Sequence, residues 1–331
     1  MMSIKNKKIA IIHDIFLHIG GAEKVLFQFI DAFPEADIYI PLISGTFKKQ
    51  LKTKGKVYTS FFSALPYVEK FASLLKPLIL IYWELLNLEK YDLIISSSHS
   101  FSSKSVNTGK KARHISYIHT PPRYLYNEYN QMSWIKKFPY FLLFWPIFFV
   151  LRKYDYYSAQ KPDLLIANSR NVQNRIKIYY KRSSTVIYPP HNTAPKSFKK
   201  KKGEYFLFFS RLEKQKGAEL IVQTCTKYQL PLVIVGTGSQ EKYLRSIAGS
   251  TVTFKGFISE EEKIRVFANA KALLYAAIDE DYGMVIPEIL SYSIPVIAYD
   301  SIVLNEFEKK DIITFKSFSS QAIFEAIQQL K

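Results

Sequence analysis

The sequence predicts a two-domain α/β protein with a Rossmann-like sheet in each half and a cleft between the halves. Short apolar runs alternate with amphipathic helical stretches along almost the whole chain, an order typical of sheets covered by helices. With 331 residues the chain is too long for one ordinary core. A basic stretch without periodicity, 193–204, is the expected linker between domains at 1–192 and 205–331.

The first half opens on an apolar run at 8–14, which predicts a buried strand rather than a signal peptide, because only four apolar residues are continuous. Gly20 and Gly21 follow, and residues 22–33 carry their apolar side chains on one helical face. The glycines are therefore expected just before a helix N-terminus, where bare backbone N–H groups can approach a phosphate. A simple tight turn is the alternative, since the full G-x-G-x-x-G pattern is missing.

Further strands are expected at 36–43, 91–99, 113–119, 162–169 and 185–191, with a helix at 170–180. The apolar stretch 68–88 is interrupted by Pro77 and predicts a pair of surface helices. His119 ends its strand and precedes a Pro-Pro loop. A histidine at such a place is often only a hydrogen-bonded polar residue, so its position alone assigns no function.

Residues 133–157 are unusually aromatic. Their apolar core, FPYFLLFWPIFFVL, has fourteen residues and two prolines, short of the roughly 20 needed to cross a bilayer. Lys136, Lys137, Arg152 and Lys153 flank it. We expect an element lying in the plane of a membrane surface. A buried helix and a single-pass anchor are the alternatives.

Composition narrows the partners and the compartment. The net charge of +18 predicts a polyanionic partner, namely nucleic acid, an anionic membrane surface or phosphorylated substrates. No zinc-finger spacing and no RNP-type aromatic strand occur, so we favour the membrane and expect no nucleic acid. The single cysteine, Cys225, excludes a disulfide framework, fits a reducing compartment and is expected to fill core space. The predicted location is cytoplasmic, on the inner face of the cytoplasmic membrane.

In the second half, a buried strand at 205–209 leads into a basic turn and a helix. Arg211 and Lys216 flank this turn, where two cations beside a helix start suit a diphosphate. The alternative is a solvated basic loop. Gly236 and Gly238 follow another strand, 231–235, and are expected to open a helix. A strand and turn at 252–259 and a helix at 260–270 come next.

Residues 272–300 form the predicted strand–helix–strand unit at the centre of the second half. Gly283 lies in the turn, and Pro287 falls in the first helical turn, where proline is tolerated. Glu280 and Glu288 flank the turn that contains Gly283, and both are expected to face the ligand crevice of an open α/β sheet. Alternatively, Glu288 only complements the helix dipole and Glu280 is solvated.

These patterns resemble glycosyltransferase family 4, whose members are retaining enzymes of the GT-B fold that use nucleotide sugars. The likeness rests on Glu280, an aromatic-Gly pair, Glu288 and the strand P-V-I-A. The stretch GGAEKV is similar to the family's first loop, and a strand-ending His before T-P-x-R-Y resembles the lipopolysaccharide mannosyltransferase subgroup. The motifs occur in the family's order from Lys8 to Leu330.

The resemblance implies a role for each matching residue. His119 would contact the transferred sugar, Arg211 and Lys216 the diphosphate, Glu280 the sugar hydroxyls and Glu288 the ribose. The implied donor-binding set is Gly236, Gly238, Phe257, Ile258, Tyr282, Gly283, Met284, Val285 and Glu288. The implied acceptor and phosphate loop is Gly20, Gly21, Arg123 and Tyr124. The resemblance implies no metal and no other cofactor.

The expected reaction is the transfer of a hexose, with retained configuration, from a GDP- or UDP-linked donor to a lipid-linked saccharide. Mannose from GDP-mannose is the first candidate. Such a reaction belongs to the synthesis of cell-surface polysaccharide or lipopolysaccharide. Three features depart from the family: Ser293 and Ile302-Val303 replace glycines, and the terminal helix is short. These departures support the alternative that the protein is a catalytically silent family member that binds lipid or a partner. A nucleotide-sugar epimerase or hydrolase is a second alternative, and a basic nucleic-acid binder a third.

Overall fold

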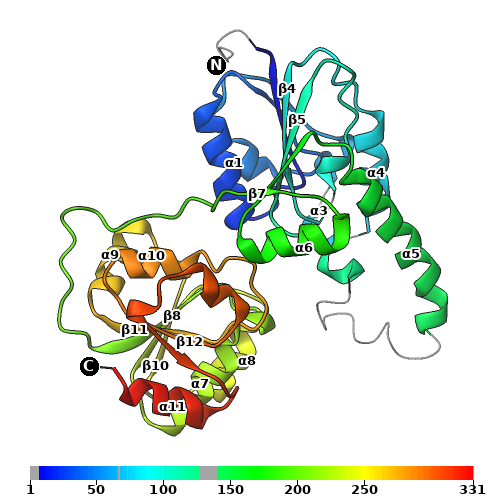
Figure 1. The fold of residues 1–331 in the computed structure, drawn as a ribbon. Coiled ribbons are helices and arrows are strands. Elements are labelled where there is room, and N and C mark those ends of the chain that lie inside the picture. The colour runs from blue at the N-terminus through cyan, green and yellow to red at the C-terminus, as the bar shows by residue number, and fades with distance from the viewer. Residues whose placement is uncertain (1–6, 66–67, 73, 101, 127–139, 331) are drawn as a thin grey trace. The chain divides into compact units, whose positions relative to one another are not determined.

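A computed structural model describes residues 7–65, 68–72, 74–100, 102–126 and 140–330. They form two compact units, Met1–Pro190 and His191–Lys331 (Figure 1). Each unit contains one parallel sheet covered by helices, which confirms the predicted architecture of two Rossmann-like α/β domains.

The sheet of the first unit has seven strands in the order β3-β2-β1-β4-β5-β6-β7. They are β1 (Ile9–His13), β2 (Asp37–Tyr39), β3 (Val57–Tyr58), β4 (Leu93–Ser98), β5 (Arg113–Ile118), β6 (Leu164–Ala167) and β7 (Thr185–Val186). The strand order reverses between β1 and β4, and the carboxyl ends of strands at such a reversal are where open α/β sheets bind ligands.

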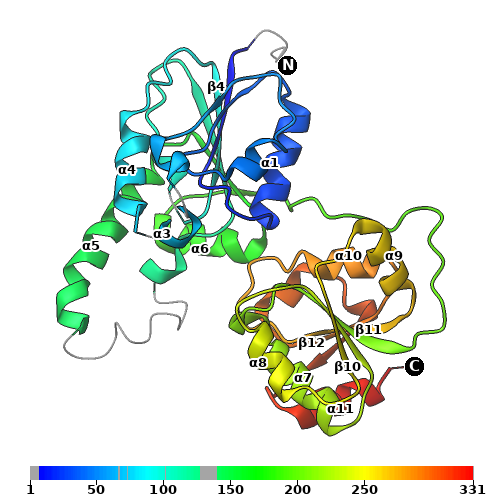
Figure 2. The same cartoon turned by 180° about the vertical axis from the view of Figure 1, so that it is seen from behind.

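Helices cover both faces of this sheet because the inner strands are apolar on both sides. They are α1 (Gly21–Ala32), α2 (Gly45–Lys48), α3 (Val68–Phe71), α4 (Lys76–Leu85), α5 (Tyr140–Ser158) and α6 (Arg170–Tyr180). Ile11 of β1 packs with Leu26 of α1, whereas Ile12 packs with the buried Trp83 of α4. Figures 1 and 2 show α1 and α4 on opposite faces.

The aromatic stretch at 133–157 corresponds to α5, which contains Pro146; residues 133–139 lie outside the described part of the chain. A buried ion pair between Lys104 and Asp155, 2.5 Å apart, ties α5 to the unit. Tyr126 adds a hydrogen bond to the same carboxylate at 2.8 Å. Among the described helices, none has the length and apolar content that crossing a membrane requires.

The sheet of the second unit has six parallel strands in the order β10-β9-β8-β11-β12-β13. They are β8 (Tyr205–Phe209), β9 (Leu232–Val235), β10 (Val252–Gly256), β11 (Ala270–Tyr275), β12 (Val296–Tyr299) and β13 (Ile312–Phe315). Its helices are α7 (Ala218–Lys227), α8 (Glu241–Ile247), α9 (Glu260–Ala268), α10 (Val285–Ser291) and α11 (Ser320–Gln328). Here the order reverses between β8 and β11.

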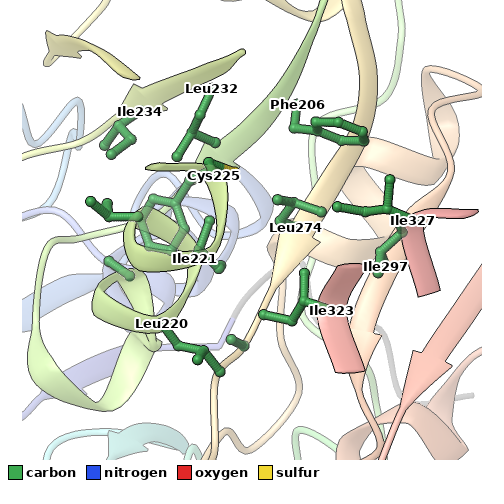
Figure 3. Packing of buried hydrophobic residues seen from close by; sticks show 14 of the residues in the cluster. Phe206, Leu220, Ile221, Cys225, Leu232, Ile234, Leu274, Ile297, Ile323 and Ile327 are labelled. Atoms are coloured by element: carbon green, nitrogen blue, oxygen red, sulfur yellow. The ribbon is translucent and has the colours of Figure 1, made fainter. Parts of the chain in front are cut away.

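One face of this sheet packs on α7 and α11 through a close-packed apolar cluster (Figure 3). Cys225 lies fully buried in it, near Ile221 and Leu274. Burial raises the pKa of its thiol to about 12, so the thiol stays protonated at neutral pH. Cys225 therefore fills core space, as predicted.

Several expected elements differ in extent. The strand expected at 36–43 is β2, Asp37–Tyr39, because Pro41 cannot donate to a ladder. Pro189 and Pro190 similarly confine the strand expected at 185–191 to β7. The segment 193–204, the expected linker, lies along the second unit: the amide of Lys201 donates to the carbonyl of Ala268 at 2.9 Å.

Candidate active site

The candidate residues fall into two groups, one in each unit. In the second unit, Lys216 and Glu280 form an ion pair, although they are far apart in the sequence. Lys216 belongs to the turn that follows β8, and Glu280 to the loop that follows β11. These strands are neighbours at the reversal of strand order. The two side chains are 16% and 18% exposed, so the pair is partly shielded yet open to a ligand.

The turn after β8 also prepares a helix N-terminus. Gly217 precedes α7 in the left-handed conformation with φ +70°, and no side chain caps this helix. A Cβ at Gly217 would lie 2.1 Å from the carbonyl oxygen of Ala276, so only glycine fits. Arg211 is exposed on the same turn. One turn thus carries two cations and leads into a helix that no side chain caps, a combination that attracts a diphosphate.

Gly236 and Gly238 serve the same loop by close packing. A Cβ at Gly236 would lie 1.9 Å from the carbonyl oxygen of Ser210, and one at Gly238 would lie 2.5 Å from that of Leu212. The glycines therefore let the loop after β9 touch the loop after β8. The prediction that they open a helix is wrong, because α8 begins only at Glu241.

Glu288 lies in the first turn of α10 and is buried. Its carboxylate accepts a hydrogen bond from Lys263 of α9 at 2.7 Å, and each side chain is only 4% exposed. Burial lowers the pKa of Lys263, but its hydrogen bonds to Glu260 and Glu288 outweigh burial and raise it. Lys263 therefore stays charged and orients Glu288, a role that the sequence analysis missed.

The other implied donor residues lie in the loops after β10 and β11 and at the start of α10. Gly283 has φ +70°, and a Cβ there would meet the hydroxyl of Tyr275 at 3.0 Å, which supports the predicted need for glycine. Tyr282 is buried against Phe307, with ring centroids 5.3 Å apart. Phe257 is 88% exposed, whereas Ile258, Met284 and Val285 are half-buried. Exposed and half-buried apolar groups of this kind suit the edge of a base or sugar.

In the first unit, a hydrogen-bonded group joins the carboxyl ends of β1, β4 and β5. The hydroxyl Oγ of Ser97 lies 2.9 Å from Nδ1 of His13 and 2.8 Å from Nε2 of His119. Ser97 is the register partner of His13 on the neighbouring strand. His119 directly follows β5 and is 8% exposed, whereas His13 is fully buried. Sequence analysis singled out only His119 of this group.

Glu23 of α1 completes the group. Oε1 lies 3.6 Å from Nε2 of His13, and Oε2 accepts a hydrogen bond from the Gly20 amide at 2.7 Å. Burial raises the pKa of Glu23, but its interactions with His13 and His99 and a hydrogen bond from the backbone outweigh burial and lower the pKa to about 2. Burial lowers the pKa of His119 to about 3. At neutral pH the group therefore holds an anionic Glu23 and an uncharged His119.

Among the residues that the structure describes, one group has potential ligand atoms within 4.8 Å of one another, close enough to share a metal ion. It consists of His13, Glu23 and His99. Histidine with carboxylate is a set that suits zinc. However, one Glu23 oxygen accepts from Gly20, and one His13 nitrogen contacts Ser97. Hydrogen bonds within the protein thus already orient these side chains.

Arg123 and Tyr124 lie on a short 3-10 turn after β5. Nζ of Lys76 on α4 lies 3.8 Å from the centre of the Tyr124 ring, and Phe148 of α5 packs against the same ring at 6.5 Å. Burial raises the pKa of Tyr124. Tyr124 therefore has a structural role, because it joins the Pro-Pro loop to α4 and α5.

Comparison with known proteins places both halves of the chain. Residues 19–194 match the model of glycosyltransferase family 4, and residues 191–331 match that of glycosyl transferases group 1. The O-antigen chain mannosyltransferase C of Escherichia coli is 26% identical over 135 residues. That alignment covers 38% of this chain and spans only 36% of the relative's length.

Solved structures share the fold. HepE of Anabaena, solved with UDP, superposes with a TM-score of 0.69 at 19% identity, covering 97% of this chain and 90% of that one. The lipopolysaccharide outer core galactosyltransferase WaaB has a TM-score of 0.64 at 18% identity, covering 98% and 89%. Since a family model spans more than half of the chain, this protein belongs to glycosyltransferase family 4, and its fold is that of GT-B enzymes.

Proposed function

We propose that the protein transfers a hexose, with retention at the anomeric carbon, from a nucleotide sugar to a lipid-linked saccharide. Mannose from GDP-mannose is our first candidate donor. The observation that carries the proposal is the Lys216–Glu280 pair: Lys216 shares the turn after β8 with Arg211 and directly precedes Gly217, where α7 starts without a side-chain cap. Likeness to an O-antigen mannosyltransferase over part of the chain supports mannose, whereas HepE was solved with UDP, so GDP and UDP are both tested below.

Donor binding would exchange partners within this pair. Glu280 neutralises Lys216 in the structure, and an incoming diphosphate competes for the same ammonium group. Lys216 and Arg211 then face the phosphates, while Glu280 turns to the hydroxyls of the sugar. As the bond from the anomeric carbon to the diphosphate breaks, both cations stabilise the growing negative charge from fixed positions.

Glu288 would hold the ribose. Lys263 contacts Oε1 of Glu288, so the carboxylate is fixed before the donor arrives and pays little entropy on binding. On the other side of the reaction, His119 would orient the sugar, and Gly20 and Gly21 would let the acceptor approach. The acceptor oxygen forms the new bond to the anomeric carbon, and its proton passes to the departing diphosphate.

We further propose that the first unit rests on an anionic membrane at the cytoplasmic face. Exposed apolar side chains gather on α4 and α5, which Tyr154 joins through a 3.0 Å hydrogen bond to Glu84. These side chains are Leu78, Ile81, Leu85, Trp145, Ile147, Phe149 and Val150. Lys153 lies among them, with Nζ 4.7 Å from the centre of the Phe149 ring. Apolar groups mixed with cations suit an interfacial element.

A transfer assay tests the reaction. Purified protein is incubated with labelled GDP-mannose or UDP-hexoses and a lipid-linked saccharide, and the anomeric configuration of the product is read by NMR. We expect transfer with retained configuration. Release of free sugar without acceptor would instead identify a hydrolase. No turnover of any donor would favour a catalytically silent member of the family. In that case Ile302 and Val303 would be replaced by glycine to test whether they cause the loss of activity.

A further inference from the structure

Two histidines at the ligand edge of the first sheet each have a buried ring nitrogen without a hydrogen bond. They are His13, which ends β1, and His99, which directly follows β4. Among the residues that the structure describes, Nε2 of His13 and Nε2 of His99 have no hydrogen-bond partner, although both atoms are buried. A buried polar atom of this kind is destabilising and is often explained by an ion that binds it. The transfer mechanism proposed above uses neither nitrogen.

A buried carboxylate completes the group His13–Glu23–His99. Oε1 of Glu23 lies 3.6 Å from Nε2 of His13, and potential ligand atoms of all three residues lie within 4.8 Å of one another. Two ligand atoms that each lie about 2.0–2.1 Å from a tetrahedral zinc ion are about 3.3 Å apart. The pair of Glu23 and His13 therefore already has nearly the separation of a formed site. The separations to His99 would have to shorten by at most about 1.5 Å.

The existing hydrogen bonds of the group use other atoms. Nδ1 of His13 contacts Oγ of Ser97 at 2.9 Å, and Oε2 of Glu23 accepts from a backbone amide at 2.7 Å. Nδ1 of His99 lies 3.6 Å from Oδ2 of Asp14, whose carboxylate accepts from two backbone amides. Histidine ligands of metals usually have an oxygen beside their second ring nitrogen, which orients the ring. Because a hydroxyl can accept, Ser97 suits the Nδ1–H form that a metal-bound His13 would have.

The charge of Glu23 also favours a cation. Its side chain is 5% exposed, and within the described ranges no lysine or arginine forms an ion pair with it. Burial lowers the pKa of Lys76 to about 8, and the charge of Asp14 acts against burial, so Asp14 is the carboxylate that matches this lysine. Buried carboxylates are paired with a counter-charge or bind a metal. A divalent ion within the group would offset the charge of Glu23 directly.

We infer that His13, Glu23 and His99 form a binding site for one divalent transition-metal ion of the zinc class, with Nε2 of each histidine and Oε1 of Glu23 as ligands. Two imidazoles and one carboxylate hold zinc in known sites that keep water in a fourth position. The side chain of His99 is 18% exposed, whereas those of His13 and Glu23 are at most 5% exposed, so the ion would enter beside His99. Neither the proposed transfer reaction nor the family resemblance requires this ion, and the inference depends on neither.

Calorimetric titration of the full chain with zinc tests the inference. The protein is produced without a polyhistidine tag, freed of metal with a chelator and titrated with ZnCl2 at neutral pH. We expect one zinc ion per chain, with a Kd of about 1 µM or lower. Mg2+ should not bind, because it prefers oxygen ligands. Absence of zinc binding would mean that a protonated His13 pairs with Glu23 instead, and would overturn the inference.

Two variants locate the ion. Glu23→Gln keeps an oxygen for the amide of Gly20, and His99→Phe keeps a ring that packs edge-on against His13. Each variant removes one ligand, so zinc binding should weaken at least about 100-fold, more than the roughly 10- to 100-fold typical of residues behind the ligands. His191→Phe is the matched control, because it removes a histidine of the second unit, and it should bind zinc as the wild type does. The same Kd in all four proteins would place the ion elsewhere and overturn the inference.

A crystal of the zinc-loaded wild type gives a readout that does not depend on how the variants fold. Anomalous scattering at the zinc absorption edge should place the ion between His13, Glu23 and His99. A zinc peak only at other residues would overturn the inference. Loss of transfer activity with zinc bound at this group would contradict only the proposed function.

Discussion

Replacing Lys263 with methionine would remove one member of the buried pair that holds Glu288. Both side chains are 4% exposed and 2.7 Å apart, so Lys263→Met leaves a carboxylate in the core without its counter-charge. Breaking such a pair costs about 3–5 kcal/mol, out of the roughly 5–15 kcal/mol that stabilises a whole protein. Glu260 adds little to this cost, because it is 75% exposed and surface pairs contribute at most about 1 kcal/mol.

The loss of stability should nearly disappear when both charged side chains are replaced. In Lys263→Met/Glu288→Leu two apolar side chains replace the pair, and such exchanges are about neutral or stabilising. Because the protein has two units, urea unfolding followed by circular dichroism is combined with hydrogen exchange of peptides from α9 and α10, which reports local stability. The reasoning is refuted if the single variant loses less than about 1 kcal/mol, or if the double variant loses as much as the single one.

Three further predictions concern stability. Ser293 has φ +53°, so Ser293→Gly should stabilise the protein by about 0.5–1 kcal/mol in urea unfolding; destabilisation would show that the left-handed backbone carries no strain. Gly217→Ala should cost at least about 2 kcal/mol, since its Cβ would lie 2.1 Å from a carbonyl oxygen; a smaller shift in melting temperature than Gly45→Ala, where no atom lies within 4 Å, would contradict this. The pKa of Glu23 is lowered from 4.5 to about 2, so its contribution, roughly 3 kcal/mol, is complete above pH 4.5 and is lost as the pH falls towards 2. Unfolding of Glu23→Gln should therefore be less pH-dependent between pH 5 and 2, and an unchanged acid profile would refute the lowered pKa.

The architecture was predictable because each inner strand is a short apolar run between polar turns. β1, β4 and β11 all read in this way, and proline explains where β2 and β7 end. β3 was missed because Val57–Tyr58 is too short to show a pattern. Periodicity says which segments are buried, and two residues carry no period.

The site was predictable only in part, because partners across a fold leave no spacing in the sequence. Glu288 was predicted as a site residue, but the sequence around it does not indicate that Lys263, on another helix, is its partner. The group around Ser97 did leave a signal that sequence analysis did not use. Three apolar strands in the first half end at or next to a histidine, His13, His99 and His119, and parallel strands bring such ends together at one edge of the sheet.

The central claim is that the turn after β8 binds the diphosphate of a nucleotide sugar. Calorimetric titration with GDP, UDP and ADP tests it directly, using the wild type, an Arg211→Ala/Lys216→Ala variant and the matched control Lys214→Ala, which removes a charge from the same turn.

We expect micromolar-to-millimolar binding of one nucleotide that weakens at least about 10-fold in the double variant and stays unchanged in the control. No binding of any nucleotide by the wild type, or equal weakening in the control, would contradict the account.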